Sequence, residues 1–161
     1  MAANARALRA GDLDAVQLFQ PTAEELLADG EFSIWMAAAE RGLTAYTTLV
    51  ARRATLAAKR DEMAAMVRAV GRTLRWLADA PGAEVARVVA PWFPDVPAPL
   101  FARAIDRYKS LGLFGPDPVT RREGYERLVA AMVSGGALAR AVPFEAAVDN
   151  SLAEAALRPP A

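Results

Sequence analysis

The chain contains no cysteine and no histidine among its 161 residues. These two absences exclude disulfide bonds, thiol nucleophiles, Ser-His-Asp triads and zinc sites built on imidazole or thiolate ligands. No run of about 18 apolar residues occurs, so the sequence predicts no membrane insertion. The first residues, MAANARALRAGD, also lack the apolar core of a signal peptide. With no convergent acid–base pair either, we expect no catalytic activity, no metal and no cofactor.

Neither basic nor acidic residues are in excess, since the chain contains 19 of each. A nucleic-acid-binding chain needs a basic patch or stripe, and this sequence has neither, so we expect no nucleic-acid partner. Hydrophobic residues make up 54% of the chain, which is enough for a sizeable core. The length fits a single domain.

Three short segments near the N-terminus have the pattern of β-strands. Ala15–Phe19 is a mostly apolar run between turn signals, as in a covered parallel strand. Phe32–Met36 is a plausible second strand. Thr44–Val50 is rich in β-branched and aromatic residues, which favour strands.

Helical patterns dominate the rest of the chain. Apolar residues between Met63 and Leu77 recur every three or four positions and predict a helix of roughly 20 residues. Thr120–Glu123 has the form of a capping box that opens another helix, which Gly135 and Gly136 end. Asp149–Ser151 favours a helix cap over a catalytic cluster. Further helices are expected over residues 2–10, 21–28, 82–90, 99–111 and 150–157.

The order and spacing of these segments resemble a known family. ALRAGDLDA, followed by an apolar strand and a residue–Pro–helix junction, is similar to the periplasmic solute-binding proteins of ABC importers. The class is that for nitrate, sulfonate, taurine and thiamine-pyrimidine precursors. The segment that begins GLTAYTTLVARR is similar to the return strand and long helix of the class, and the segment that begins WFPDVPAPLF to its helical C-terminal section.

The resemblance implies an α/β fold: a partial type II periplasmic-binding-protein fold that is helix-rich and has few strands. On that plan residues 1–42 are the C-terminal part of lobe two. Residues 43–161 are the return strand and the C-terminal helices of lobe one. Most strands of both family sheets would lie upstream of Met1, which is then either an internal methionine or the start of a remnant.

The function that the resemblance implies is solute binding, by a component or fragment of an ABC importer. The ligand would be a small polar or anionic organic solute such as a sulfonate, nitrate or a pyrimidine precursor, and the partner an ABC permease. The location would be periplasmic or extracytoplasmic, or cytoplasmic if Met1 is the true start. An alternative is a non-binding helical remnant or interaction module that self-associates. The related fungal thiamine-pyrimidine synthases use a histidine and a cysteine-rich motif, which this chain lacks.

Five residues are candidate ligand contacts. Gln20 stands between a predicted strand and a predicted helix, where α/β proteins bind ligands, although it is also placed to cap the helix. Phe19 and Tyr46 offer an aromatic wall for a planar ligand, or ordinary core. Thr47 offers a hydroxyl donor. Trp35 either lines the cleft or, as we favour, anchors a pair of strands.

The predicted elements are too few to bury their own apolar faces. The stripe over residues 63–77 and the strand over residues 15–19 would leave an exposed apolar patch and open sheet edges. A second copy of the chain is the commonest remedy. We therefore expect a homodimer with a large apolar interface.

Overall fold

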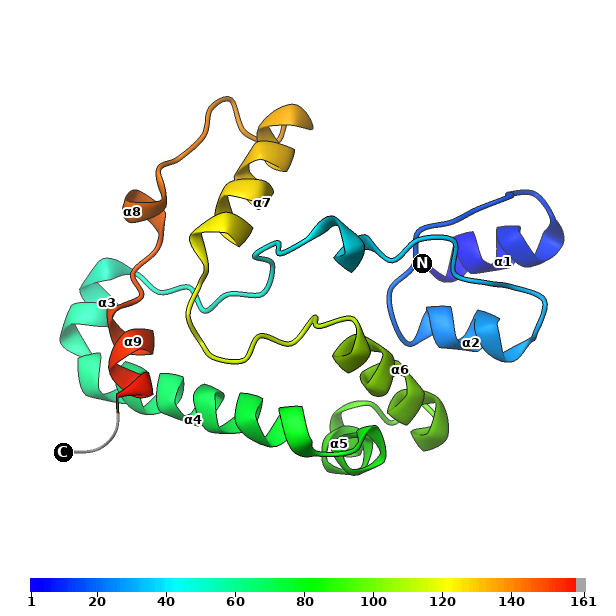
Figure 1. The fold of residues 1–161 in the computed structure, drawn as a ribbon, viewed down its shortest axis with the longest axis horizontal. Helices are drawn as coiled ribbons and strands as arrows, with labels where there is room; N and C mark the ends of the chain where they lie inside the picture. The colour runs from blue at the N-terminus through cyan, green and yellow to red at the C-terminus, as the bar shows by residue number, and fades with distance from the viewer. Residues whose placement is uncertain (159–161) are drawn as a thin grey trace. The chain divides into compact units, whose positions relative to one another are not determined.

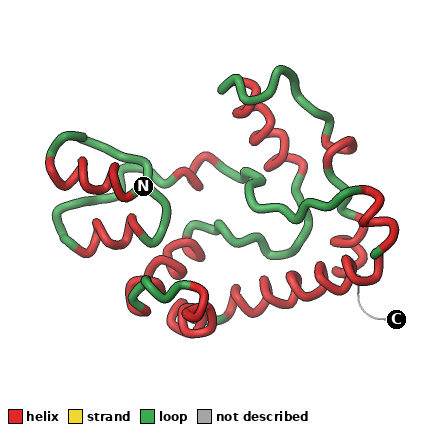
Figure 2. Tube along the Cα trace, turned by 180° about the vertical axis from the view of Figure 1, so that it is seen from behind, coloured by secondary structure: helices red, strands yellow, loops and turns green. Residues whose placement is uncertain are grey.

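Every regular element in residues 1–158, the part of the chain that the structure describes, is helical. The structure is a computed structural model, and Figure 2 shows helices joined by loops over this range. The expected α/β fold, a partial periplasmic-binding-protein fold, is therefore wrong for this structure. The α-helices (Figure 1) are α1 Ala2–Ala10, α2 Thr22–Ala28, α3 Arg53–Ala58, α4 Arg60–Asp79, α5 Gly82–Val89, α6 Ala98–Ser110, α7 Arg122–Ser134, α8 Phe144–Ala147 and α9 Ser151–Leu157, with short 3₁₀ helices η1 Ala38–Arg41 and η2 Ala90–Trp92.

The three segments expected as strands are loops. A strand is stable only when its backbone pairs with a neighbour and one face is covered. Neither condition is met here, because the large side chains of these segments face solvent. Trp35 is 90% exposed and Tyr46 is 79% exposed, while Phe19 is half exposed. The β-forming composition of these segments is real, but within the described residues nothing pairs with them.

The chain forms two compact units, and each is built from two stretches of sequence. Unit 1 comprises residues 1–38 and 79–114, and unit 2 comprises residues 39–78 and 115–161, of which residues 159–161 lie outside the described range. The assignment of residues 1–42 and 43–161 to two lobes of a longer fold stays a prediction.

Unit 1 is organised around the contact of α5 with α6, which lie side by side (Figure 1). Small residues, including the almost fully buried Ala86 and Ala104, let the two helix backbones approach closely. Gly82 lies in the same contact, and its N–H donates a hydrogen bond of 2.8 Å to Oδ1 of Asp106. Helix α2, whose Leu26 is also buried, packs on α6, and α1 packs on α2.

Unit 2 is held together largely by contacts between helices and loops. The guanidinium of Arg127 on α7 donates to the carbonyl of Leu43 at 2.8 Å, and the N–H of Ala45 donates to the carbonyl of Gly124 at 2.9 Å. Gly124 permits this approach, since a Cβ there would lie 3.0 Å from the backbone nitrogen of Ala45. These contacts fix the start of the 43–50 segment on the first turns of α7.

A second tie in unit 2 joins the loop before α7 to the start of α9. The side-chain amide of Asn150 accepts a hydrogen bond from the N–H of Thr120 at 3.0 Å and donates to its carbonyl at 2.9 Å. The expected capping box at Thr120–Glu123 does not form, because α7 begins at Arg122 and Arg121 occupies the cap position without a side-chain bond. At α9 the expected cap position is occupied by Asn150 without a side-chain bond to the helix, and Asp149 accepts a hydrogen bond from the N–H of Ser151 at 2.9 Å in the turn before it.

The core of the described residues is thin. Its buried apolar side chains are mostly alanine with a few larger residues, and no side chain in the described range is fully buried. The chain exposes 11493 Å². Two separate globules of half its mass would expose about 9,400 Å² by the usual scaling of surface with mass. An unusual amount of surface, much of it apolar, is therefore left open.

Candidate functional site

Gln20 lies where the chain enters α2, through a cis peptide bond to Pro21. Its side-chain oxygen accepts a hydrogen bond from the N–H of Glu24 at 3.1 Å, and its amide nitrogen lies 3.4 Å from the carboxylate of the same residue. Its backbone N–H donates to the hydroxyl of Tyr108 on α6 at 3.0 Å. Gln20 therefore caps α2, which is the structural alternative that the sequence offered for it.

The carboxylate of Glu24 forms the charged centre of this region. Glu24 is only 3% exposed, and it accepts a close charge-assisted hydrogen bond from the guanidinium of Arg107. The guanidinium of Arg103, one turn earlier on α6, lies 3.7 Å from the other carboxylate oxygen. A buried carboxylate is stable only when it is paired, so this cluster holds α2 against α6. The cluster has a structural role.

A small apolar cavity adjoins Gln20 in unit 1. Its volume is about 110 Å³, well below the 300 Å³ or more typical of sites for drug-sized ligands. The rings of Phe93 and Phe101 meet edge to face on one wall, with centroids 4.9 Å apart. The lining residues are Gln20, Pro21, Phe93, Val96, Phe101, Ala104, Ile105 and Tyr108. This cavity accommodates a group of a few heavy atoms.

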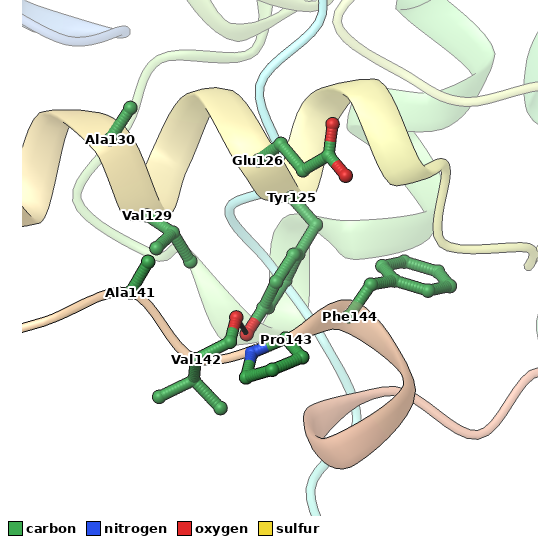
Figure 3. A pocket seen from close by; sticks show the side chains of 8 residues that line it. All are labelled: Tyr125, Glu126, Val129, Ala130, Ala141, Val142, Pro143 and Phe144. Atoms are coloured by element: carbon green, nitrogen blue, oxygen red, sulfur yellow. Dashed lines mark hydrogen bonds between the residues drawn. The ribbon is translucent and has the colours of Figure 1, made fainter.

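A larger pocket of about 300 Å³ lies in unit 2, between α7 and the segment that leads into α8. Figure 3 shows Tyr125 reaching from α7 to this segment, where its hydroxyl donates to the carbonyl of Val142 at 2.9 Å. The rings of Tyr125 and Phe144 meet edge to face at 5.4 Å. The remaining lining residues are Glu126, Val129, Ala130, Ala141 and Pro143. The walls are thus mostly apolar.

Two further charged residues lie beside Phe144 on one wall of this pocket. The guanidinium of Arg122 lies over the ring of Phe144, 4.5 Å from its centroid, and pairs with the carboxylate of Glu145. The hydrogen bond between these two side chains raises the pKa of Arg122 and lowers the pKa of Glu145. A hydrogen bond with Ser151 likewise lowers the pKa of Asp149. These groups are all ionised at neutral pH. The pair Arg122–Glu145 ties α8 to α7, and the bond between Asp149 and Ser151 orders the turn into α9.

The five candidate ligand contacts divide between the two units. Phe19, Gln20 and Trp35 belong to unit 1, whereas Tyr46 and Thr47 belong to unit 2. Of the five, Gln20 alone borders either cavity described above. The other four are exposed, so Phe19 is not in the core and Trp35 does not anchor a pair of strands. Ligand contact by all five stays a prediction.

Two features have no local signal in the sequence. Glu24 and Arg107 are 83 residues apart, so no local pattern predicts their ion pair. Tyr125 lies on an apolar helix face, which is typical of core, but it is half buried and lines the pocket. The pair Pro143 and Phe144 was the available signal for a turn over α7.

No helix in the described range is long and apolar enough to cross a membrane. No group of three or more metal-ligating side chains occurs in the same range.

The chain is similar to a protein of Bacillus subtilis (strain 168) that is described as "Putative binding protein YtlA". The two are 26% identical over 151 residues, which is 93% of this chain but 45% of the Bacillus protein. The chain therefore spans less than half the length of this curated relative. No protein-family model matches the chain. No solved structure matches it either.

Proposed function

We propose that the chain belongs to the solute-binding component of an ABC importer. The proposed ligand is a small polar or anionic organic solute such as a sulfonate, nitrate or a pyrimidine precursor. The observation that carries the proposal is the similarity to a protein described as a binding protein, which extends over 93% of this chain. The proposed partner is an ABC permease, and the proposed location is periplasmic or extracytoplasmic.

The proposed ligand contacts are Gln20, Phe19, Tyr46, Thr47 and Trp35. The four besides Gln20 are exposed and therefore free to meet a ligand. In the proposed mechanism a ligand enters between two lobes that close over it, and polar groups fix its orientation. The reaction is binding alone, and we propose no catalytic step.

The isolated chain should bind such solutes weakly. Its cavity beside Gln20 has a volume of about 110 Å³ and is mostly apolar, so it lacks the converging polar groups that hold an anion. We expect calorimetry with taurine, nitrate and an aminopyrimidine to give affinities weaker than micromolar. Micromolar affinity would show that the exposed residues form a site without further polypeptide.

A transport assay tests the proposal directly. Deletion of the gene is expected to reduce uptake of one labelled solute among taurine, nitrate and an aminopyrimidine, and permease and ATPase genes are expected beside it. Complementation with Gln20→Ala should restore less uptake than complementation with Gln17→Ala. Gln17 is a matched control because it is an exposed glutamine three residues away. Normal uptake in the deletion strain, with no transporter genes nearby, would overturn the proposal.

A second candidate function is a self-associating interaction module that binds no solute. The large apolar side chains that each of the two units leaves exposed between Leu13 and Val50 favour it, because association buries exposed apolar surface. In that case the deletion strain transports normally while the purified chain still associates. The two candidates are thus separated by uptake rather than by oligomeric state.

A further inference from the structure

The segment Leu43–Val50 of unit 2 is an uncharged, exposed stretch of chain. No charged residue occurs from Gly42 to Ala51, although arginines stand directly on either side. Val50 is 91% exposed, and Leu43, Tyr46 and Leu49 are each more than half exposed. Surface loops are normally polar, so an apolar loop without a cover needs an explanation.

The backbone of this segment is only partly used. The carbonyl of Leu43 and the N–H of Ala45 bond to α7, and this fixes the start of the segment. Among the described residues, no backbone hydrogen bond is shown from Tyr46 to Ala51. Six consecutive residues therefore present free donors and acceptors next to apolar side chains. This combination is typical of a chain edge that pairs with another chain.

The composition of the segment favours pairing with an identical copy. Thr44–Val50 is rich in β-branched and aromatic residues and contains no proline, glycine or charge, which is the signature of segments that stack on themselves. Electrostatic repulsion between two copies is small, because the segment is neutral and the whole chain has a formal net charge of zero. Two copies related by a twofold axis present the same surface to each other, so each donor meets an acceptor.

The open surface is also large enough for a stable dimer. The chain exposes 11493 Å². That value exceeds the area expected for two separate globules of half the mass by roughly 2,000 Å². Stable homodimers bury about 1,000 Å² or more on each partner. The surplus on one copy is therefore of the size that a second copy covers.

We infer that residues 46–51 pair, antiparallel and backbone to backbone, with the same segment of a second copy of this chain. The segment makes the centre of a twofold homodimer, and Leu43 packs beside it. This inference does not depend on the proposed transport function.

Cysteine cross-linking tests the geometry, because the chain has no cysteine of its own. In the pairing above, residue 47 of one copy faces residue 50 of the other, so a mixture of Thr47→Cys and Val50→Cys chains brings two thiols within reach of a short bismaleimide. A mixture of Thr73→Cys and Val50→Cys chains is the matched control, since Thr73 is an exposed threonine on α4 of the same unit. We expect a cross-linked dimer from the first mixture at several times the yield from the second. Equal yields would overturn the inference.

Sedimentation equilibrium at micromolar concentration tests the assembly. The expected mass is twice 17.2 kDa. Val50→Lys should give a monomer with unchanged helical content, because the side chain is exposed in the single chain, whereas in the pair the lysine would face Thr47 of the second copy and its charge would lose water. Leu157→Lys, an exposed position on α9, should remain dimeric. A folded wild-type monomer, with the segment covered by a different polypeptide or by none, overturns the inference. So does a dimer that survives Val50→Lys, or an open-ended aggregate.

Discussion

Replacing Gly82 with alanine is expected to destabilise unit 1, although helix propensity alone favours the change. Gly82 is the first residue of α5, and alanine normally stabilises a helix by about 0.5–1 kcal/mol relative to glycine. A Cβ at this position would lie 2.4 Å from the carbonyl oxygen of Ala102 and 2.5 Å from Oδ1 of Asp106. The first of these atoms is backbone and has no side-chain freedom, so α5 and α6 must move apart.

The magnitude follows from what that movement disrupts. The hydrogen bond from the N–H of Gly82 to the carboxylate of Asp106 is charge-assisted, and losing such a bond costs about 1.5–3 kcal/mol. Overpacking a close contact adds about 1–3 kcal/mol. Set against the gain in propensity, the net loss in the free energy of unfolding is about 2–5 kcal/mol. Urea unfolding followed by far-ultraviolet circular dichroism measures it.

Gly71→Ala is the matched control within α4. The nearest atoms to a Cβ there are Nη1 of Arg75 at 3.7 Å and Cδ of Pro118 at 3.8 Å, which are ordinary contacts. This variant should be stabilised by about 0.5–1 kcal/mol. A Gly82→Ala variant as stable as wild type, beside a stabilised Gly71→Ala, would refute the close approach of α5 to α6.

Three further outcomes are expected. Arg107→Met removes the main partner of the buried Glu24 and should cost about 1–3 kcal/mol, part of which Glu24→Gln in the same chain restores in a double-mutant cycle. Asn150→Ala removes both hydrogen bonds to Thr120 and should cost about 1–2 kcal/mol in urea unfolding, with no change expected if the loop before α7 is held elsewhere. The pKa of Asp149 is lowered in the folded chain, so its contribution to stability is present above the unfolded pKa of about 4 and is lost as the pH falls through the folded pKa. Asp149→Asn should therefore flatten the acid side of the profile of stability against pH, as measured by thermal melts.

The sequence predicted the helices well because their signals are local. The helix expected over residues 2–10 is α1, and Gly11 ends it in the left-handed conformation, with φ of 76°. The helix expected over residues 99–111 differs from α6 by one residue at each end. An amphipathic period and a terminating glycine depend on a few neighbouring residues, so they can be read without knowing the partner.

The strands failed because a strand depends on residues elsewhere. Thr44–Val50 has a strong β propensity, but propensity measures how well a residue fits a paired and half-buried surface. Two contacts hold the start of this segment on α7, and residues 46–51 make no backbone hydrogen bond within the described residues. The composition therefore indicates a segment that can form a strand, but no partner strand for it occurs among the described residues.

The candidate site shows the same division. The position of Gln20 in the sequence predicted either a ligand contact or a helix cap. In the structure Gln20 is the cap, because its side-chain oxygen accepts a hydrogen bond from the N–H of Glu24. What could not be predicted were the partners on α6, since Tyr108 lies 88 residues away from Gln20. Contacts at such separations follow from tertiary packing, which no local pattern encodes.

The proposed function and the proposed dimer compete for the same residues, and this competition has a measurable consequence. Tyr46 and Thr47 are proposed ligand contacts, and they also lie within the segment proposed to pair between copies. If a solute binds these side chains only in the monomer, it must pull the dimer apart. At a ligand concentration equal to its dissociation constant, each of the two monomers is stabilised, and the apparent dissociation constant of the dimer rises about four-fold. Sedimentation with and without taurine or an aminopyrimidine reads this shift. Binding that leaves the dimer unchanged would place the solute away from residues 46–51. Dissociation of the dimer by the solute would show that this one segment serves both dimer formation and solute binding.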